Sequence, residues 1–300
     1  MQIQTNRNQR ELKSHGDVSF PILVSHESIT SYELNTFSWH WHPEIELTLI
    51  EEGEMMYQIN GHEMHVQKGD LLFSNCNALH SGHSIDGRAC YYWSITFDSK
   101  LIYGFENSLI QTKYVDAVVS AKEFSSLLFD GSESWHHDLK ELVCELISLS
   151  SDKSDFYEIK IQMQLTKIWL MLLEHRTSFS LNENALNPKT SARLKAILSF
   201  IHENFEKKIS LDDIANSVHL CKSECCRFFK KHMQESLFDY LLRYRIEQSI
   251  PLLKNPEYSI TEAALCCGFS DAGYYSRMFK RYTGVSPREY RMSLFPDYNR

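Results

Sequence analysis

The C-terminal third of the chain contains the same helix-turn-helix pattern twice. In each copy a short apolar segment is followed by a tight turn and then by a second segment, in which an aromatic residue, Phe229 or Phe279, is flanked by basic residues. The paired arginines Arg227 and Arg277 stand 50 residues apart. Because the second helix of such a motif enters the major groove of DNA, the repeat predicts a DNA-binding domain with two recognition helices.

Three stretches of the second copy occur in a fixed order, and they are Gly268-Phe269-Ser270-Asp271, Tyr274-Tyr275-Ser276-Arg277 and Gly284-Val285-Ser286-Pro287. Arg245-Ile246-Glu247 stands between the two copies. Over residues 193–293 this pattern resembles the AraC family of transcription regulators. The resemblance implies that a long helix connects two helix-turn-helix motifs, at about 211–232 and 260–282.

The chain departs from the family pattern at three places. His219 occupies the turn of the first copy, where the family has glycine, so we expect backbone strain or an altered turn there. Pro251 falls late in the connecting helix, where it removes a backbone donor and can kink the helix. The first recognition helix carries Cys221, Cys225 and Cys226, where the family favours serine, leucine and a polar residue.

The residues expected to contact DNA face outward from the two recognition helices. They are Lys222, Ser223, Glu224, Cys226, Arg227 and Lys230 in the first helix, and Ala272, Gly273, Ser276, Arg277 and Lys280 in the second. Arg227 and Arg277 can reach base edges, with bidentate contact to guanine as the expected mode. Because Ala272 and Gly273 offer few polar contacts, the second helix is expected to read DNA shape or a thymine methyl group.

Further basic residues follow in each recognition helix. Lys230 and Lys231 in the first, and Lys280 and Arg281 in the second, are expected to hold phosphates. The alternative for Lys231 and Arg281 is that they are only solvated surface charge.

The net charge of −8 is unevenly distributed along the chain. Residues 191–300 hold 17 basic and 13 acidic side chains, whereas the preceding residues hold 14 basic and 26 acidic ones. The positive excess therefore lies where DNA phosphates require it. The acidic N-terminal part suits a small molecule or another protein.

Eight cysteines without a signal peptide favour a reducing, cytoplasmic location. The longest apolar run, Ile168–Leu173, is too short to span a membrane, so no membrane association is expected. The adjacent pairs Cys225-Cys226 and Cys266-Cys267 do not follow a C-x-x-C zinc pattern. We expect buried or half-buried cysteines, and a redox or metal role for Cys221, Cys225 and Cys226 with His219 is the alternative.

Residues 18–98 are typical of β-structure. Short runs rich in branched and aromatic residues are separated by turn residues, and they are Phe20–Val24, Glu46–Ile50, Met55–Ile59, His62–Val66, Leu71–Phe73 and Tyr91–Phe97. Asn60-Gly61 between two of these runs is a strong hairpin signal. Many short, evenly spaced strands favour a jelly-roll sandwich or barrel.

Helical spacing of apolar residues then appears twice between 137 and 175, which predicts two antiparallel helices joined near 150–152. We expect this pair to dimerise or to relay a signal. The predicted fold is thus α+β and multidomain. It comprises a cupin-like β-barrel at 1–105, a helical dimerisation segment at 106–180, a linker at 181–192 and an all-α DNA-binding domain at 193–300.

The segment from His40 to Glu46 is rich in histidines and acidic residues, whose side chains can bind metals or polar ligands. His40, His42, Glu46 and Gly53 match the first cupin motif, and Gly69 and His80 match part of the second, although Asn75 and Asn77 replace its usual proline and glycine. Since alternate residues of a strand share a face, the side chains from 40 to 46 at even positions are expected on one side.

Such a set in cupin enzymes ligates one divalent metal, and three imidazoles with a carboxylate suit Zn, Fe, Mn or Ni. The resemblance implies a second reading, in which this segment is barrel scaffold and pocket lining without metal or other cofactor. Both readings stay open. Residues expected to line an effector pocket are Trp39, His40, Trp41, His42, Glu46, Tyr57, His80 and Trp93, with plain barrel core as the alternative for the aromatic ones.

The sequence therefore predicts a ligand-responsive transcription regulator rather than an enzyme. Its expected partners are double-stranded promoter DNA, a small polar effector such as a sugar, a second copy of the chain and, for an activator, RNA polymerase. The alternative is a metal-dependent cupin enzyme or a metal-sensing regulator that uses His40, His42, Glu46 and His80. Control by a protein partner is a third hypothesis.

Overall fold

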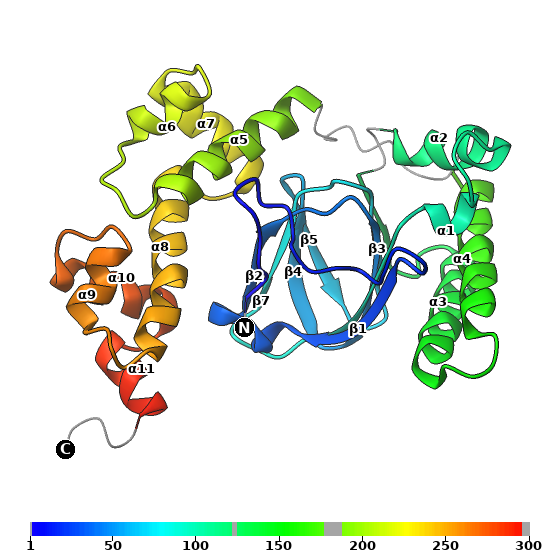
Figure 1. The fold of residues 1–300 in the computed structure, drawn as a ribbon, viewed down its shortest axis with the longest axis horizontal. Helices are drawn as coiled ribbons and strands as arrows, with labels where there is room; N and C mark the ends of the chain where they lie inside the picture. The colour runs from blue at the N-terminus through cyan, green and yellow to red at the C-terminus, as the bar shows by residue number, and fades with distance from the viewer. Residues whose placement is uncertain (1, 122–124, 177–187, 296–300) are drawn as a thin grey trace. The chain divides into compact units, whose positions relative to one another are not determined.

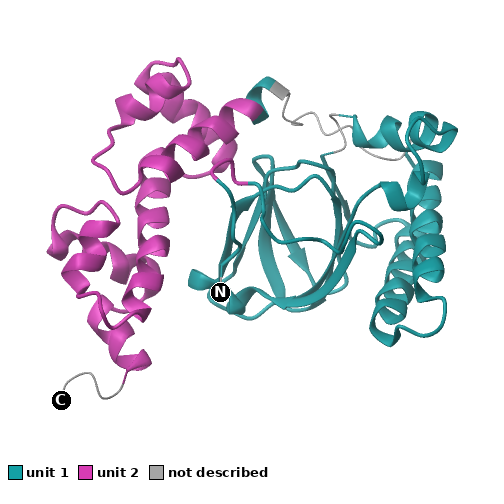
Figure 2. Ribbon diagram, in the orientation of Figure 1, with its two compact units in different colours: residues 1–6, 10–191 teal, residues 7–9, 192–300 magenta. Residues whose placement is uncertain are grey.

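The structure is a computed structural model that describes residues 2–121, 125–176 and 188–295. It divides into two compact units, residues 1–6 with 10–191 and residues 7–9 with 192–300 (Figure 2). Most of the expected linker at 181–192 lies outside the described residues. Its last part begins helix α5, Pro188–Asn204, which is consistent with the preference of proline for the first turn of a helix.

The first unit contains two antiparallel sheets that together form a barrel (Figure 1). One sheet has the strand order β1 (Ile22–Ser28), β8 (Tyr91–Phe97), β3 (Ile45–Glu52), β6 (Leu71–Ser74) and β9 (Ser126–Phe129). The other has the order β2 (Thr36–His40), β7 (His80–Ser84), β4 (Glu54–Ile59) and β5 (His62–Gln67). The predicted antiparallel β-domain is confirmed.

The turn between β4 and β5 shows why its sequence gives a hairpin. Asn60 and Gly61 have φ values of 49° and 83°, and Ile59 pairs with His62 directly across the turn. A tight two-residue turn with positive φ at both central positions matches the right-handed twist of the strands, and Asn-Gly tolerates that conformation best. This predicted hairpin is confirmed.

Three strands were absent from the prediction. The register of β2 shifts between Phe37 and His40, and β7 has the polar sequence His-Ser-Gly-His-Ser, so neither strand shows simple alternation. Strand β9 pairs with β6 although it lies beyond residue 105, where the barrel was expected to end. The region from 106 to 176 therefore belongs to the same compact unit as the barrel.

Two helices cover the outer face of the five-stranded sheet. Helices α3 (Ser134–Asp152) and α4 (Tyr157–Glu174) pack against each other, and Leu139, Leu165 and Ile168 share one buried cluster with Leu47 and Ile95 of the sheet. The inner apolar faces of both helices are thus buried against the barrel, whereas Ile159, Met163 and Leu170 on the outer side of α4 stay exposed. Short helices α1 (Lys100–Tyr103), η3 (Gln111–Val115) and α2 (Asp116–Val119) precede them.

The second unit consists of helices in its described residues. After α5 come α6 (Leu211–Ser217), α7 (Lys222–Met233), α8 (Leu237–Lys254), α9 (Ile260–Cys266), α10 (Ala272–Thr283) and α11 (Pro287–Leu294). Helices α6 and α9 begin with capping boxes, Ser210 with Asp213 and Ser259 with Glu262. The pairs α6–α7 and α9–α10 are two helix-turn-helix motifs, and the long helix α8 connects them (Figure 1).

Helix α8 runs through Pro251, which lies in its last turn. Arg245 of α8 donates from Nε to the carbonyl oxygen of Phe205 (2.8 Å) and from Nη2 to that of Lys207 (2.7 Å), which ties α8 to the end of α5. The hydroxyl of Tyr275 donates to Ser249 Oγ over 3.0 Å and anchors α10 on the same helix.

The equivalent turns of the two motifs both use left-handed backbone. Gly268 has a φ of 78° and His219 a φ of 54°, so His219 does adopt the conformation that favours glycine. All eight cysteines are free, and Cys144, Cys221 and Cys266 are exposed, contrary to the expectation of burial.

Candidate effector cavity and DNA-reading helices

The barrel contains a cavity of about 390 Å³ that is partly open to solvent. Its walls come from the N-terminal segment (residues 2–6 and 10–15) and from strands of both sheets. The lining residues are Gln2, Ile3, Gln4, Glu11, Leu12, Lys13, His15, Leu23, Ser25, Glu27, Tyr32, Phe37, His40, Glu46, Tyr57, His80, Tyr92, Ser94 and Thr96. A space of this size is suitable for a small metabolite.

Four of the eight residues predicted for the effector pocket line this cavity, and they are His40, Glu46, Tyr57 and His80. His42 is buried beside them and contacts Glu46. Trp39 and Trp41 are not among the lining residues, and Trp93 points out of the barrel, where its Nε1 donates to Glu51 (3.2 Å). Strand alternation explains the last case, since Tyr92 and Ser94 face inward and Trp93 lies between them.

Glu46 is the centre of a buried hydrogen-bond network. Its Oε1 accepts from Thr48 Oγ1 (2.9 Å) and Ser94 Oγ (3.1 Å), and its Oε2 lies 3.1 Å from His42 Nε2 and 3.4 Å from His80 Nε2. Burial alone would raise the pKa of this carboxyl, but the contacts with His42 and His80 hold it well below its usual range. Glu46 is therefore a buried carboxylate, and its charge requires these partners.

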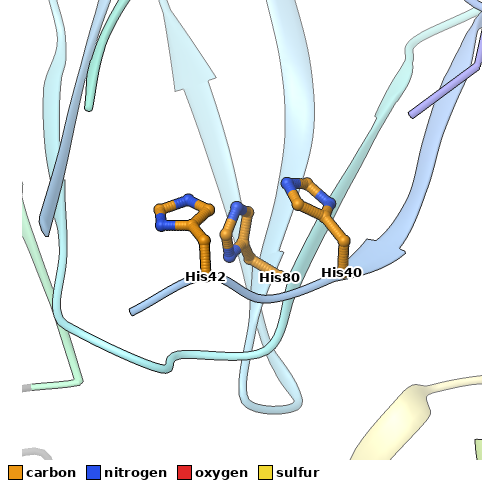
Figure 3. Close-up of side chains that lie close together, drawn as sticks. All are labelled: His40, His42 and His80. Carbon is orange, nitrogen blue, oxygen red and sulfur yellow. The ribbon is translucent and has the colours of Figure 1, made fainter. Parts of the chain in front are cut away.

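The histidine cluster, His40, His42 and His80, lies side by side with the ring of His80 between the other two (Figure 3). The sequence placed residues 40–46 on one strand, but β2 ends at His40 and β3 begins at Ile45. The chain turns between these strands, yet His42 still reaches the cluster. Burial and the neighbouring rings of His80 and His42 hold the pKa of His40 well below its usual value.

The histidines share one further contact. In each ring Nδ1 contacts a backbone carbonyl oxygen. Nδ1 of His40 lies 2.9 Å from the Ser38 carbonyl oxygen, Nδ1 of His42 lies 3.2 Å from that of Glu44, and Nδ1 of His80 lies 2.9 Å from that of Ala78. A carbonyl can only accept, so each Nδ1 must carry the proton that it donates.

An ion-pair cluster holds the N-terminal segment against the barrel. His15 lies 3.2 Å from Glu11 and 3.3 Å from Glu44, and Glu11 N donates to the carbonyl oxygen of Trp41 (3.0 Å). Burial opposes a charge on His15, but the two carboxylates outweigh it and raise the pKa of this imidazole to about 9. His15 is consequently a cation at neutral pH. None of these contacts was foreseen from the sequence.

The chemistry of the cavity wall is acidic and aromatic. Glu11, Glu27 and Glu46 line it, while the lysine among the lining residues, Lys13, is 3.6 Å from Glu27. The ring centroids of Phe37 and Tyr57 are 5.4 Å apart, part of an aromatic group that includes Tyr32 and Tyr92. These faces and acceptors suit a polar molecule that has no negative charge.

All eleven residues predicted to contact DNA lie on helices α7 and α10, and each is exposed or half-buried. Phe229 and Phe279 are fully buried on the opposite faces of the same helices. The Arg277 guanidinium lies 5.8 Å from the centre of the Tyr274 ring, and Lys222 is 3.4 Å from Asp212. Arg281 is 3.5 Å from Asp239, so this residue is engaged within the unit itself.

A barrel domain with an internal cavity and a helical domain with two helix-turn-helix motifs define a DNA-binding regulator with a sensor domain. Residues 28–167 match the family model described as an AraC-like ligand binding domain, and residues 214–293 match that of a helix-turn-helix domain. Among the helices in the described parts of the chain, none combines the length and apolar character needed to cross a membrane.

Comparison with known proteins gives the family. The uncharacterized HTH-type transcriptional regulator YdeC of Bacillus subtilis (strain 168) is 30% identical over 286 residues, which are 95% of this chain and 97% of YdeC. The melibiose operon regulatory protein of Escherichia coli (strain K12) is 23% identical over 255 residues, 84% of this chain and 82% of that protein. The crystal structure of ToxT from Vibrio cholerae O395 is 12% identical, with a TM-score of 0.42, and covers 91% of this chain and 98% of ToxT.

The chain belongs to the AraC family of transcription regulators. It is a ligand-responsive regulator with a sensor domain and a helix-turn-helix DNA-binding domain.

Proposed function

We propose that a small, neutral, polyhydroxylated metabolite such as a sugar binds in the barrel cavity and thereby controls promoter binding. The observation that carries this proposal is the composition of the cavity wall. Glu11, Glu27 and Glu46 face the cavity. The cations that line it, Lys13 and His15, already pair with Glu27 and with Glu11 and Glu44, so an anionic ligand would have to compete with carboxylates for them. Sugar hydroxyls donate to carboxylates, and aromatic rings pack on sugar faces. The name of the melibiose operon regulatory protein, a relative, is consistent with this class of ligand.

A ligand screen tests this proposal. Thermal unfolding of the full-length chain is measured against neutral sugars, sugar phosphates and fatty acids, and only neutral sugars are expected to raise the melting temperature. Glu27→Gln should then weaken the response at least tenfold, because Glu27 lies on the cavity wall. Glu51→Gln is the matched control, since Glu51 is exposed and hydrogen-bonds to His26 outside the cavity. Stabilisation by an anionic ligand alone would contradict the proposal.

Promoter recognition is assigned to the exposed faces of α7 and α10. Arg227 and Arg277 occupy equivalent exposed positions in the two helices, which places one long, planar donor on each. Such side chains contact the O6 and N7 of guanine through two hydrogen bonds. Lys230 and Lys280 follow one helical turn later, and their charges are assigned to the phosphates on either side.

A homodimer through α4 is the proposed assembly. Ile159, Met163 and Leu170 are 60%, 58% and 54% exposed, and their spacing of four and seven residues places them on one outer stripe of the helix. Thr166 and Lys167 interrupt this stripe, but the three exposed apolar side chains on one side of the helix can pair with those of a second copy across a twofold axis. If the DNA-bound dimer activates transcription, RNA polymerase is a further partner.

A further inference from the structure

The guanidinium of Arg277 is held at the start of helix α10. A long side chain in a helix leans back over the residues three and four positions before it, which here are Tyr274 and Gly273. The guanidinium carbon lies 5.8 Å from the centre of the Tyr274 ring, within the range of a cation–π contact. A Cβ added at Gly273 would lie 3.9 Å from Arg277 Nη1. The guanidinium therefore lies over the first turn of the helix, beside a residue that has no side chain.

The Tyr274 ring is itself supported from within the domain. Tyr274 is half-buried, and its ring centroid lies 6.2 Å from that of Phe269, which is 3% exposed. The backbone N–H of Tyr274 donates to the carboxylate of Asp271, the residue that caps α10. These contacts restrict where the ring can lie, so it offers a fixed face to an arginine side chain that is otherwise exposed.

The place of the guanidinium matters for base reading. The N-terminal residues of a recognition helix contact base edges, and arginine reads guanine through two hydrogen bonds to O6 and N7. An arginine that already lies at this end of the helix loses less conformational freedom on binding than a freely rotating one. We infer that Tyr274 is a positioning residue, which holds the Arg277 guanidinium for guanine and thereby contributes to sequence preference. This inference rests on the proposed guanine contact of Arg277.

The first motif has a different residue at the equivalent place. Glu224 stands three residues before Arg227, as Tyr274 stands three before Arg277. Hydrogen bonds from Cys221, whose Sγ lies 3.1 Å from Glu224 Oε2, lower the pKa of this carboxyl, and the charge of Arg227 adds to the effect. A carboxylate beside the arginine can itself accept from cytosine N4. The two helices should therefore read different bases, and the preference given by Arg227 should not depend on Tyr274.

The role of Tyr274 is tested with the full-length chain on a duplex that this chain selects from a randomised library. Competition binding with each of the four bases at every position identifies the guanine preference that Arg277→Ala removes. Tyr274→Ala should reduce that preference by about five- to thirtyfold, the range for a cation–π contact from which DNA excludes water. Tyr274→Phe keeps the ring and should retain the parent preference. In an Arg277→Ala background, Tyr274→Ala should reduce the preference no further.

Two further variants complete the experiment. Tyr114→Ala is the matched control, because Tyr114 is an exposed tyrosine whose ring centre lies 5.0 Å from Lys113 Nζ in the other unit. Its base preferences should equal those of the parent chain. Tyr274→Leu keeps apolar bulk against Phe269 without an aromatic face, and it replaces Tyr274→Ala if that chain does not fold by circular dichroism.

Three results would overturn the positioning role. They are an unchanged guanine preference without the Tyr274 ring, an equal loss of affinity on every sequence, which makes Tyr274 a structural residue, and a Tyr274→Phe chain as defective as Tyr274→Ala, which assigns the effect to the hydroxyl. The guanine contact is judged separately. If Arg277→Ala weakens binding to every sequence equally, that contact fails and the positioning role fails with it. A preference that is lost in Arg277→Ala but kept in Tyr274→Ala rejects the positioning role alone.

Discussion

The two helix-turn-helix turns should respond in opposite ways to the same kind of substitution. Gly268 and His219 occupy equivalent left-handed positions, but their surroundings differ. A Cβ added at Gly268 would lie 2.3 Å from the carbonyl oxygen of Phe205 and 2.9 Å from Arg245 Nη2. His219 is exposed and already carries a side chain. Gly268→Ala should therefore destabilise the second unit, and His219→Gly should not.

The magnitudes follow from the contacts. Alanine in left-handed backbone costs about 1–2 kcal/mol. Displacing the Phe205 carbonyl weakens a charge-assisted hydrogen bond from Arg245, worth about 1.5–3 kcal/mol. Alanine also makes the unfolded chain less flexible than glycine does, and this stabilises the folded state by about 0.5–1 kcal/mol. The expected net loss is about 2–4 kcal/mol, or about 8–16 °C in melting temperature for a unit of this size. His219→Gly removes the strain of a left-handed residue from the folded state, but it also makes the unfolded chain more flexible. The free energy of unfolding is therefore expected to rise by about 0–1 kcal/mol.

The distribution of tryptophan provides the assay. All five tryptophans lie in the first unit, at positions 39, 41, 93, 135 and 169, so tryptophan fluorescence follows that unit alone. Far-ultraviolet circular dichroism also follows the helices of the second unit. Gly268→Ala should lower the melting temperature of the second unit, which circular dichroism follows, and leave the transition seen by tryptophan fluorescence unchanged. The reasoning fails if the loss is below 1 kcal/mol, if the fluorescence transition moves with it, or if His219→Gly is equally destabilising.

Three other outcomes are expected. Arg277→Ala should cost about 1–3 kcal/mol of DNA-binding free energy and relax preference at one base position, and an equal loss on every sequence in a competition assay would make Arg277 a phosphate contact. The stability of the first unit, followed by tryptophan fluorescence, should fall by about 3 kcal/mol between pH 6.5 and 9. The reason is that the pKa of His15 is raised to about 9, so its contribution is complete below the unfolded value and is lost as the pH rises through 9. His15→Gln should abolish that slope, and a slope that persists would assign it to other groups. Leu170→Lys should convert the dimer to a monomer in light scattering, whereas Lys167→Ala on the same helix should not, and a monomeric parent chain would refute the interface.

Local sequence patterns were sufficient to predict the helix-turn-helix motifs of the DNA-binding unit and most strands of the barrel. The helix-turn-helix motifs depend on short-range signals, such as Ser210 three residues before Asp213, and these signals give the same structure wherever they occur. Alternation along a regular strand likewise predicts which residues share its inner face and which share its outer face. Along β8, Tyr92 and Ser94 line the cavity, so alternation places Trp93 on the outer face, and its prediction as a pocket residue was wrong.

The cavity wall was harder because its residues break the local rules. The register shift in β2 lets Phe37 and His40 both line the cavity although they are three residues apart, a spacing that alternation forbids. The N-terminal segment has neither apolar periodicity nor a motif. It is held by contacts between residues far apart in sequence, as when Gln2 donates from Nε2 to the Thr36 carbonyl oxygen (3.0 Å) and His15 pairs with Glu44. Such contacts exist only once the barrel has formed, so a polar segment without a recognisable pattern in the sequence supplies much of the cavity wall.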